Sequence, residues 1–125
     1  MTQEQKELLL KDLCARLPYG VKGLVTFNGN HFMTQHQVED RTIDGKLYDR
    51  FAEFQSSWYD NVTIKPYLFP MSSMTEEQKT SHNFLKHSAY ANPIKLVDWY
   101  NKNHFDYRGL IPMGLANDAT GKNIY

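Results

Sequence analysis

The sequence predicts a single α+β domain: an N-terminal helix, a small curved antiparallel sheet or SH3-like barrel, then two helices and a turn-rich C-terminal tail. Three observations indicate this class. Apolar residues recur at helical spacing near the N-terminus, aromatic and β-branched residues fill residues 21–69, and two further helix-start signals follow. No low-complexity linker divides the 125 residues, and this length is typical of one domain. We therefore treat residues 1–125 as one domain.

The first helix is predicted over residues 2–17. Thr2 can cap it, and Gln5 stands three positions later, which is the spacing of a capping box. Pro18 and Gly20 are typical of a helix end. Apolar residues then form one helical stripe, which we expect to be buried: Leu9, Leu10, Leu13, Cys14 and Leu17.

The sheet is predicted over residues 21–69, with four or five antiparallel strands. The dipeptides Asn28-Gly29 and Asp44-Gly45 are both typical of tight hairpin turns, because these residue types tolerate the positive φ that such turns need. The segment SSWYDNVTIKPYLFP is rich in aromatic and β-branched residues. A meander of this size often rolls into an open barrel, which hides its strand edges.

Two more helices follow the sheet. The hexapeptide MTEEQK at residues 74–79 nearly repeats MTQEQK at residues 1–6, and Thr75 and Gln78 again have capping-box spacing. Because the sequences diverge directly afterwards, we interpret the repeat as one capping device used twice. Asn92-Pro93 starts the last helix. Five residues are expected to form its buried face: Ile94, Leu96, Val97, Trp99 and Tyr100.

Composition makes several classes of function less favoured. Fourteen Lys and Arg balance fourteen Asp and Glu, and such a neutral chain lacks the basic excess of most nucleic-acid-binding proteins. The N-terminus lacks the apolar block of a signal peptide, and no apolar run is long enough to span a membrane. We therefore expect a cytoplasmic protein with no membrane partner. The single cysteine, Cys14, is predicted to be buried and unreactive.

The segment NHFDYRG at residues 103–109 contains the candidate catalytic residues His104, Asp106 and Arg108. In an extended chain their side chains would share one face, and a histidine oriented by a carboxylate beside a guanidinium suits acid–base chemistry. The alternative is structural: Asp106 caps the next turn, Arg108 pairs with it, and His104 ends the preceding helix. We favour the structural interpretation.

No metal or cofactor is predicted. His82 and His87 are five residues apart, as are His31 and His36, so neither pair has the i, i+4 spacing of a helical metal site. Ligands could still come from distant elements, such as His36 with Asp40. The sequence also contains no phosphate-binding loop of the P-loop or GxGxxG type.

Aromatic residues are dense between positions 48 and 69. The band consists of Tyr48, Phe51, Phe54, Trp58, Tyr59, Tyr67 and Phe69. Core packing should account for most of them, but exposed members could form a binding surface for a peptide or for stacked bases. We take Tyr48, Tyr59, Tyr67 and Phe69 as the candidate binding residues, with Tyr48 and Tyr59 the ones expected to be exposed.

Three segments carry a resemblance to known proteins: KDLCARLPYGVKG, IKPYLFPMSSMTEEQK and DWYNKNHFDYRGLIPMGLA. In this order and spacing they resemble a group of short uncharacterised proteins encoded by gut Bacteroidales and by their phages and mobile elements. The resemblance covers most of the chain outside residues 24–62. It implies a bacterial or phage origin and a cytoplasmic location, and it brings no activity, cofactor or catalytic residue.

These observations favour a non-enzymatic module that binds a protein through its sheet or through the PYLFPMSSM loop, residues 66–74. Two alternatives stay open. One is a nucleic-acid-binding accessory protein, and the other is a small hydrolase-like enzyme that uses His104, Asp106 and Arg108.

Overall fold

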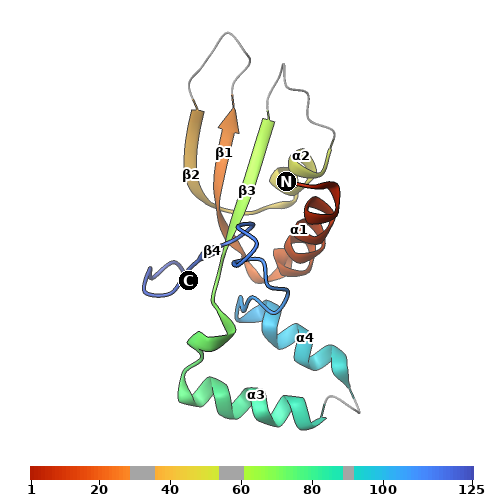
Figure 1. Ribbon diagram of the computed structural model, residues 1–125, viewed down its shortest axis with the longest axis vertical. Coiled ribbons are helices and arrows are strands. Elements are labelled where there is room, and N and C mark those ends of the chain that lie inside the picture. Colours follow the sequence, from red (N-terminus) through yellow and green to blue (C-terminus); the bar gives the residue numbers. More distant parts are fainter. Residues whose placement is uncertain (29–35, 54–60, 89–91) are drawn as a thin grey trace.

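The computed structural model describes residues 1–28, 36–53, 61–88 and 92–125, and it has the predicted α+β class (Figure 1). The elements are, in chain order, α1 (Gln3–Arg16), β1 (Lys22–Asn28), β2 (His36–Thr42), α2 (Gly45–Ala52), β3 (Asn61–Leu68), α3 (Glu76–Ser88), α4 (Pro93–Lys102) and β4 (Asn117–Asp118). Short 3-10 turns, η1 (Leu17–Tyr19) and η2 (Met71–Ser73), follow α1 and β3.

Both predicted capping boxes are confirmed. The Thr2 hydroxyl accepts a hydrogen bond from the Gln5 backbone N–H at 3.1 Å, and the Gln5 side chain accepts one from the Thr2 backbone at 2.9 Å. Thr75 and Gln78 repeat both bonds at the same distances. The two similar hexapeptides therefore satisfy the free N–H groups of two helix starts in the same way.

The sheet is open and mixed. Its strand order is β2-β1-β3-β4, with β1 antiparallel to both neighbours and the short β4 parallel to β3. The described strands do not close into a barrel, so the expectation of an SH3-like barrel is not supported. The chain leaves the sheet after β2 to form α2, and after β3 to form α3 and α4, so too few strands follow one another to close a barrel.

The hairpin turn predicted at Asp44-Gly45 is wrong, whereas the predicted pairing of the strands on either side of Asn28-Gly29 is confirmed. Asp44 is the N-cap of α2, because its side chain accepts a hydrogen bond from the Leu47 backbone N–H at 2.8 Å. Leu47 and Phe51 are then buried one helical turn apart, and this burial favours the helix over a turn. β1 and β2 pair antiparallel as predicted, with Asn28 opposite His36; the turn predicted at Asn28-Gly29 runs into residues 29–35, which lie outside the described residues.

The core is formed by residues of α1, α2, β1 and β3, and both helices lie on the β3 side of the sheet in Figure 1. Its members include Leu9, Leu13, Val25, Leu47, Phe51, Val62 and Ile64. Gly23 allows β1 and β3 to approach, because a Cβ atom there would lie 2.9 Å from the carbonyl oxygen of Lys65.

The buried stripe of α1 differs from the predicted one. Leu9 and Leu13 are buried as expected, but Cys14 is exposed, so the prediction of a buried thiol is wrong. The stripe instead includes Asp12 and Arg16, which are completely buried. Because these two charged side chains pair with each other, the helix can turn them inward and leave Cys14 in solvent.

The helices α3 and α4 form an antiparallel hairpin that projects from the end of the sheet (Figure 1). We call these two helices the α3–α4 hairpin. The predicted buried face of α4 is only partly correct: Trp99, Tyr100 and Leu96 are half-buried, whereas Ile94 and Val97 are exposed. Only the C-terminal half of α4 reaches the rest of the protein, so the apolar residues of its first turns have nothing in the described chain to pack against.

Candidate functional site

The first candidate region is a buried polar junction between α1 and the segment after α4. Arg16 donates two hydrogen bonds to the Asp12 carboxylate, at 2.9 and 3.0 Å, and both side chains are fully buried. Arg16 also donates to the carbonyl oxygen of Phe105 at 2.5 Å, while Arg108 Nε lies 3.6 Å from Asp12. Arg16 therefore ties the first helix to the segment that contains the predicted catalytic residues.

His104 also lies at this junction, and its lowered pKa makes it a poor general base at neutral pH. Burial, and secondarily the positive charge of Arg16, lower the pKa of His104 to about 4, while a hydrogen bond to the Tyr19 backbone opposes the shift. The ring stacks on Tyr125, with centroids 3.8 Å apart. A base with so low a pKa holds few protons at pH 7 and accepts one weakly.

Asp106 and Arg108 do not orient His104. The Asp106 carboxylate accepts hydrogen bonds from the backbone N–H groups of Leu110 at 2.7 Å and Ile111 at 2.9 Å, while Arg108 faces Asp12. The backbone of His104 is left-handed, with φ of 59°, and this interrupts the extended chain that would place the three side chains on one face. The geometry favours the structural interpretation, with Asp106 as a cap.

The candidate binding aromatics also have structural contacts. Tyr67 is buried and donates a hydrogen bond to Asp40 at 2.6 Å, which together with burial raises the pKa of Tyr67 to about 12. Phe69 is half-buried between Phe105 and Tyr125, with ring centroids 6.3 and 5.9 Å away. Tyr48 is half-buried against the core. Tyr59 lies outside the described residues.

The described residues contain neither a cluster of metal-binding side chains nor a helix that could span a membrane. Within residues 1–28, 36–53, 61–88 and 92–125, no three His, Cys, Asp or Glu side chains gather as metal ligands would. In the same ranges no helix has both the length and the apolar character needed to cross a membrane.

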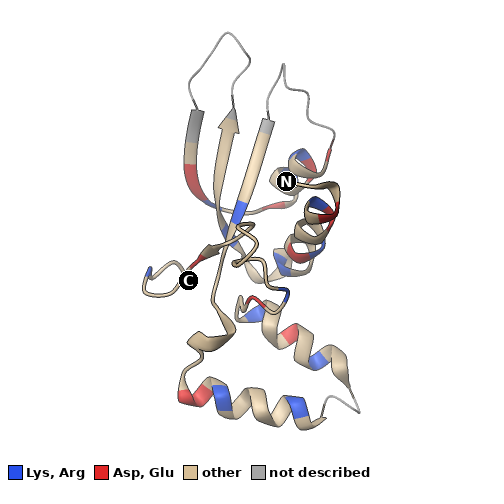
Figure 2. Cartoon of the chain, viewed as in Figure 1, with Lys and Arg blue, Asp and Glu red and all other residues tan. Residues whose placement is uncertain are grey.

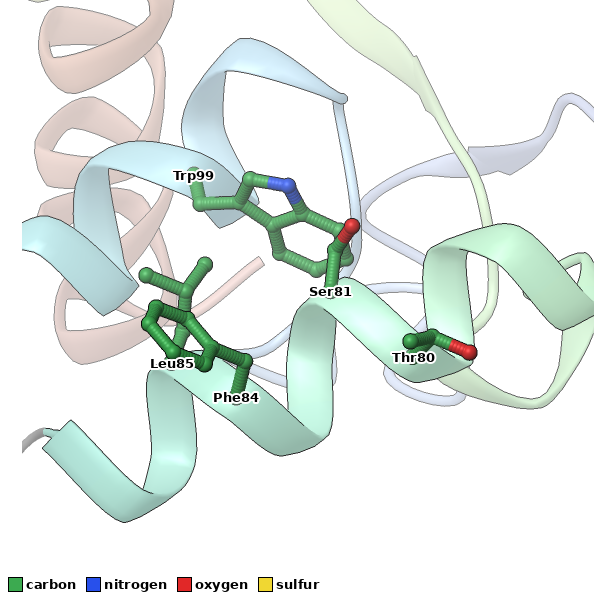
Figure 3. A pocket seen from close by; sticks show the side chains of 5 residues that line it. All are labelled: Thr80, Ser81, Phe84, Leu85 and Trp99. Atoms are coloured by element: carbon green, nitrogen blue, oxygen red, sulfur yellow. The ribbon is translucent and has the colours of Figure 1, made fainter.

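The second candidate region is a groove in the α3–α4 hairpin, shown in Figure 3. It is a shallow, open depression of about 460 Å³, lined by Thr80, Ser81, Phe84, Leu85 and Trp99. The lining is mainly apolar, with two hydroxyl groups at one end.

One aromatic contact holds the two sides of this groove together. The His82 ring lies parallel to Trp99, and its Nε2 atom is 2.6 Å from the Tyr100 hydroxyl. Burial, and then the positive charge of Lys86, lower the pKa of His82. Trp99 stacks in turn on Phe105, at 5.4 Å between centroids, which fixes α4 to the rest of the protein. The groove is therefore held in a defined shape.

Three large apolar side chains of the α3–α4 hairpin lack cover from the described chain. Phe84 is 72% exposed, Ile94 75% and Val97 40%. Sequence analysis assigned Ile94 and Val97 to the core and so missed this surface. A signal was present: α3 offers only Phe84 and Leu85 as large apolar residues, too few for a helix that packs into a core.

Comparison with models of known protein families, with curated proteins and with solved structures found no match. The resemblance to short proteins of gut Bacteroidales and their phages therefore stays a prediction.

Proposed function

We propose that the chain is a cytoplasmic, non-enzymatic protein-interaction module of bacterial or phage origin, and that the α3–α4 hairpin is its docking surface. The observation that carries the proposal is the exposure of three large apolar side chains on the two helices of the hairpin, Phe84, which lines the groove, and Ile94 and Val97 on α4. Large apolar side chains that gather on a surface are typical of binding sites, whereas scattered single ones are not.

The packing of α3 supports the same proposal. This helix has 13 residues and none of them is buried. Isolated helices of this length are only marginally stable in water, and most helical stability in proteins comes from a packed apolar face. Among the described elements, α4 is the one against which α3 packs closely. A bound partner would supply the missing contacts on the opposite side of α3.

The buried polar junction around Arg16 and Asp106 has the contacts of a structural feature and not those of a catalytic site. Its carboxylates are engaged, by Arg16 at Asp12 and by backbone N–H groups at Asp106. The hydrolase-like alternative needs these groups free to meet a substrate, so it finds less support than the interaction module. The nucleic-acid alternative likewise lacks a basic excess in the whole chain.

A library of random peptides displayed on phage tests the proposal. We expect the protein to enrich a family of related peptides that bind wild type and Val38→Ala equally but lose binding to Phe84→Ala. Val38 is the matched control because it is also an exposed apolar residue, but it lies on β2, away from the hairpin. Failure to enrich any peptide, or enrichment of peptides that bind Phe84→Ala as well as wild type, would contradict the proposal.

A further inference from the structure

The outer edge of β3 lacks a neighbouring strand over part of its length. Residues 61–66 of β3 pair with β1 on one side, whereas the described chain places β4 on the other side only at residues 67–68 (Figure 1). The segment before β4 does not continue along this edge, because it turns at Gly114, which has a left-handed backbone with φ of 76°. The edge beside Ile64 therefore has no strand next to it in the described chain.

The backbone N–H and C=O groups of Ile64 point to this edge. In an antiparallel pair these groups face the partner strand at every second residue. The Ala119 N–H donates to the Leu68 carbonyl oxygen at 2.8 Å, so Leu68 faces away from β1. Pro66 and Ile64 face the same way, and Pro66 fits this assignment because it has no N–H to offer a neighbouring strand. No hydrogen bond within the described chain reaches the Ile64 backbone at this edge.

Ile64 is nevertheless buried, with 2% of its surface exposed. A buried peptide N–H or C=O without a partner destabilises a protein, so such groups are rare. A partly open cavity of about 260 Å³ lies beside Ile64, and its walls include apolar side chains of α1, α2 and the segment before β4, namely Leu9, Phe51 and Leu115. The cavity therefore combines apolar walls with the unpaired donor and acceptor of one strand residue.

The two edges of the sheet also differ in charge (Figure 2). β2 forms one edge and carries three charged residues in a row, Glu39, Asp40 and Arg41. Charged side chains on an edge strand disfavour pairing with a further strand. β3, which is free at the other edge where β4 stops, carries a single charged residue, Lys65. The edge at Ile64 is therefore the one less protected against the addition of a strand.

We infer that this cavity binds an extended peptide of another protein, one residue of which pairs antiparallel with Ile64. In such a pair the peptide residue donates its N–H to the Ile64 carbonyl oxygen and accepts a hydrogen bond from the Ile64 N–H. Directly opposed side chains share one face of a sheet. The side chain of the peptide residue therefore lies on the face where Ile64 packs with Leu9 and Phe51, and an apolar side chain suits it.

A peptide matches this site better than a purely apolar ligand, which would leave both backbone groups of Ile64 unpaired. Main-chain hydrogen bonds to a sheet edge, together with a pocket for one side chain, are the elements of peptide binding by strand addition. The cavity is smaller than the pockets of about 300–1,000 Å³ that enclose drug-sized ligands, so it suits one side chain. The inference is independent of the docking surface proposed on the α3–α4 hairpin, because the cavity and the groove share no residue.

NMR couplings across hydrogen bonds, measured on the full chain alone, test the free edge. The N–H groups of Thr63 and Lys65 should couple to the carbonyl carbons of Thr26 and Leu24, their partners on β1. The N–H of Ile64 should couple to no carbonyl carbon of the chain. A coupling from Ile64 to any other residue would show that the chain itself already pairs with this edge, and would overturn the inference.

A short capped peptide with Leu at its centre and Ser elsewhere tests binding. One backbone pair and one side chain should bind in about the millimolar range, which is too weak for selection from a phage library but measurable by ¹H–¹⁵N correlation titration. The peptide should move the Ile64 signal most, with smaller shifts at Phe51 and Leu115. The matched control has N-methyl-leucine at the centre, which keeps the side chain but removes the donor to the Ile64 carbonyl oxygen. It should bind about ten-fold more weakly. Equal binding of both peptides, or a parent peptide that moves none of these signals, contradicts the inference.

Variants of the chain separate this site from others. Leu115→Phe enlarges a wall of the cavity and should weaken binding, whereas Met113→Phe should not, because Met113 is exposed on the same segment and does not line the cavity. If Leu115→Phe does not fold, the comparison of the two peptides on wild type still decides. Phe84→Ala should bind the peptide as wild type does; loss of binding there would place the peptide on the hairpin, so that this inference fails while the proposed function stands. An Ile64 signal that moves with protein concentration alone would assign the edge to a second copy and overturn the inference.

Discussion

The His82 ring lies flat on Trp99, with the ring centroids 5.7 Å apart and the ring planes 11° from parallel. The same imidazole reaches the Tyr100 hydroxyl at 2.6 Å. Although α3 has no buried residue, this pair of contacts links it to α4. The docking surface therefore depends on one histidine that lies partly in solvent.

His82→Ala should release α3 without unfolding the sheet. A stacked pair and one hydrogen bond together contribute on the order of 1–2 kcal/mol, so amide hydrogen exchange in α3 should become about ten-fold faster. Exchange in β1 and β3 should not change. Hydrogen exchange followed by mass spectrometry measures both, with the exposed neighbour Asn83→Ala as control. Equal exchange in α3 of wild type and His82→Ala would contradict the role of this contact.

Arg16→Met should destabilise the whole domain. It leaves the buried Asp12 carboxylate without its close partner, and breaking a buried ion pair in this way costs about 3–5 kcal/mol in the free energy of unfolding. Urea denaturation measures the loss. The double variant Asp12→Leu, Arg16→Met should recover most of it, because no charge then stays buried.

The exposed pair of Arg41 with Glu39, at 3.9 Å, is the matched control for the buried one. Arg41→Ala should cost less than about 1 kcal/mol, because exposed ion pairs contribute little. Similar losses for Arg16→Met and Arg41→Ala would show that burial of the Asp12 pair is unimportant.

His104 should make the protein sensitive to mild acid. Its pKa of about 4 in the folded state lies below the ordinary value of 6.5, so the unfolded chain binds a proton more readily between these values. Stability is therefore complete above pH 6.5 and falls as the pH is lowered towards 4. The shift corresponds to at most about 3 kcal/mol.

His104→Asn isolates this effect, because asparagine tolerates the left-handed backbone at position 104 and has no group that titrates in this range. Urea denaturation at about pH 7 and about pH 4.5 compares the two proteins. Acid should destabilise wild type more than His104→Asn. If both lose the same stability over this interval, His104 is not the group responsible.

Asp106→Ala tests the structural interpretation of the NHFDYRG segment. The variant leaves the backbone N–H groups of Leu110 and Ile111 without their acceptor, which should cost about 1–3 kcal/mol. Thermal unfolding measures the change, with the exposed Asp49→Ala as control. If Asp106→Ala is as stable as wild type, Asp106 does not act as a cap, and the catalytic interpretation of this residue has to be reconsidered.

The sequence predicts the local features of this fold well. The caps at Thr2 and Thr75 were identified because a capping box involves residues three positions apart, and its energetics are contained within that segment. The dipeptide Asp44-Gly45 was misinterpreted because aspartate is favoured both in hairpin turns and at helix N-caps. Burial of Leu47 and Phe51 against other elements decides between them, and this is not a local property.

The candidate site depended on such distant contacts and was therefore missed. Helical spacing shows that Ile94 and Val97 share a face, but not whether another element covers that face. The burial of Arg16 could not be predicted from the sequence either, because charged residues are expected at the protein surface unless a buried partner is known. That partner, Asp12, lies one turn away, and the carbonyl oxygen of Phe105 comes from the far end of the chain.

The most direct test of the docking surface is a ¹H–¹⁵N correlation titration of the full chain with a Phe84-dependent peptide selected from the phage library. The backbone signals that move should belong to residues 80–88 and 93–99, which surround the groove, while those of β1 and β2 stay in place. Signals that move on the sheet instead, or a peptide that moves none, would contradict the assignment of the α3–α4 hairpin as the surface where a protein partner binds.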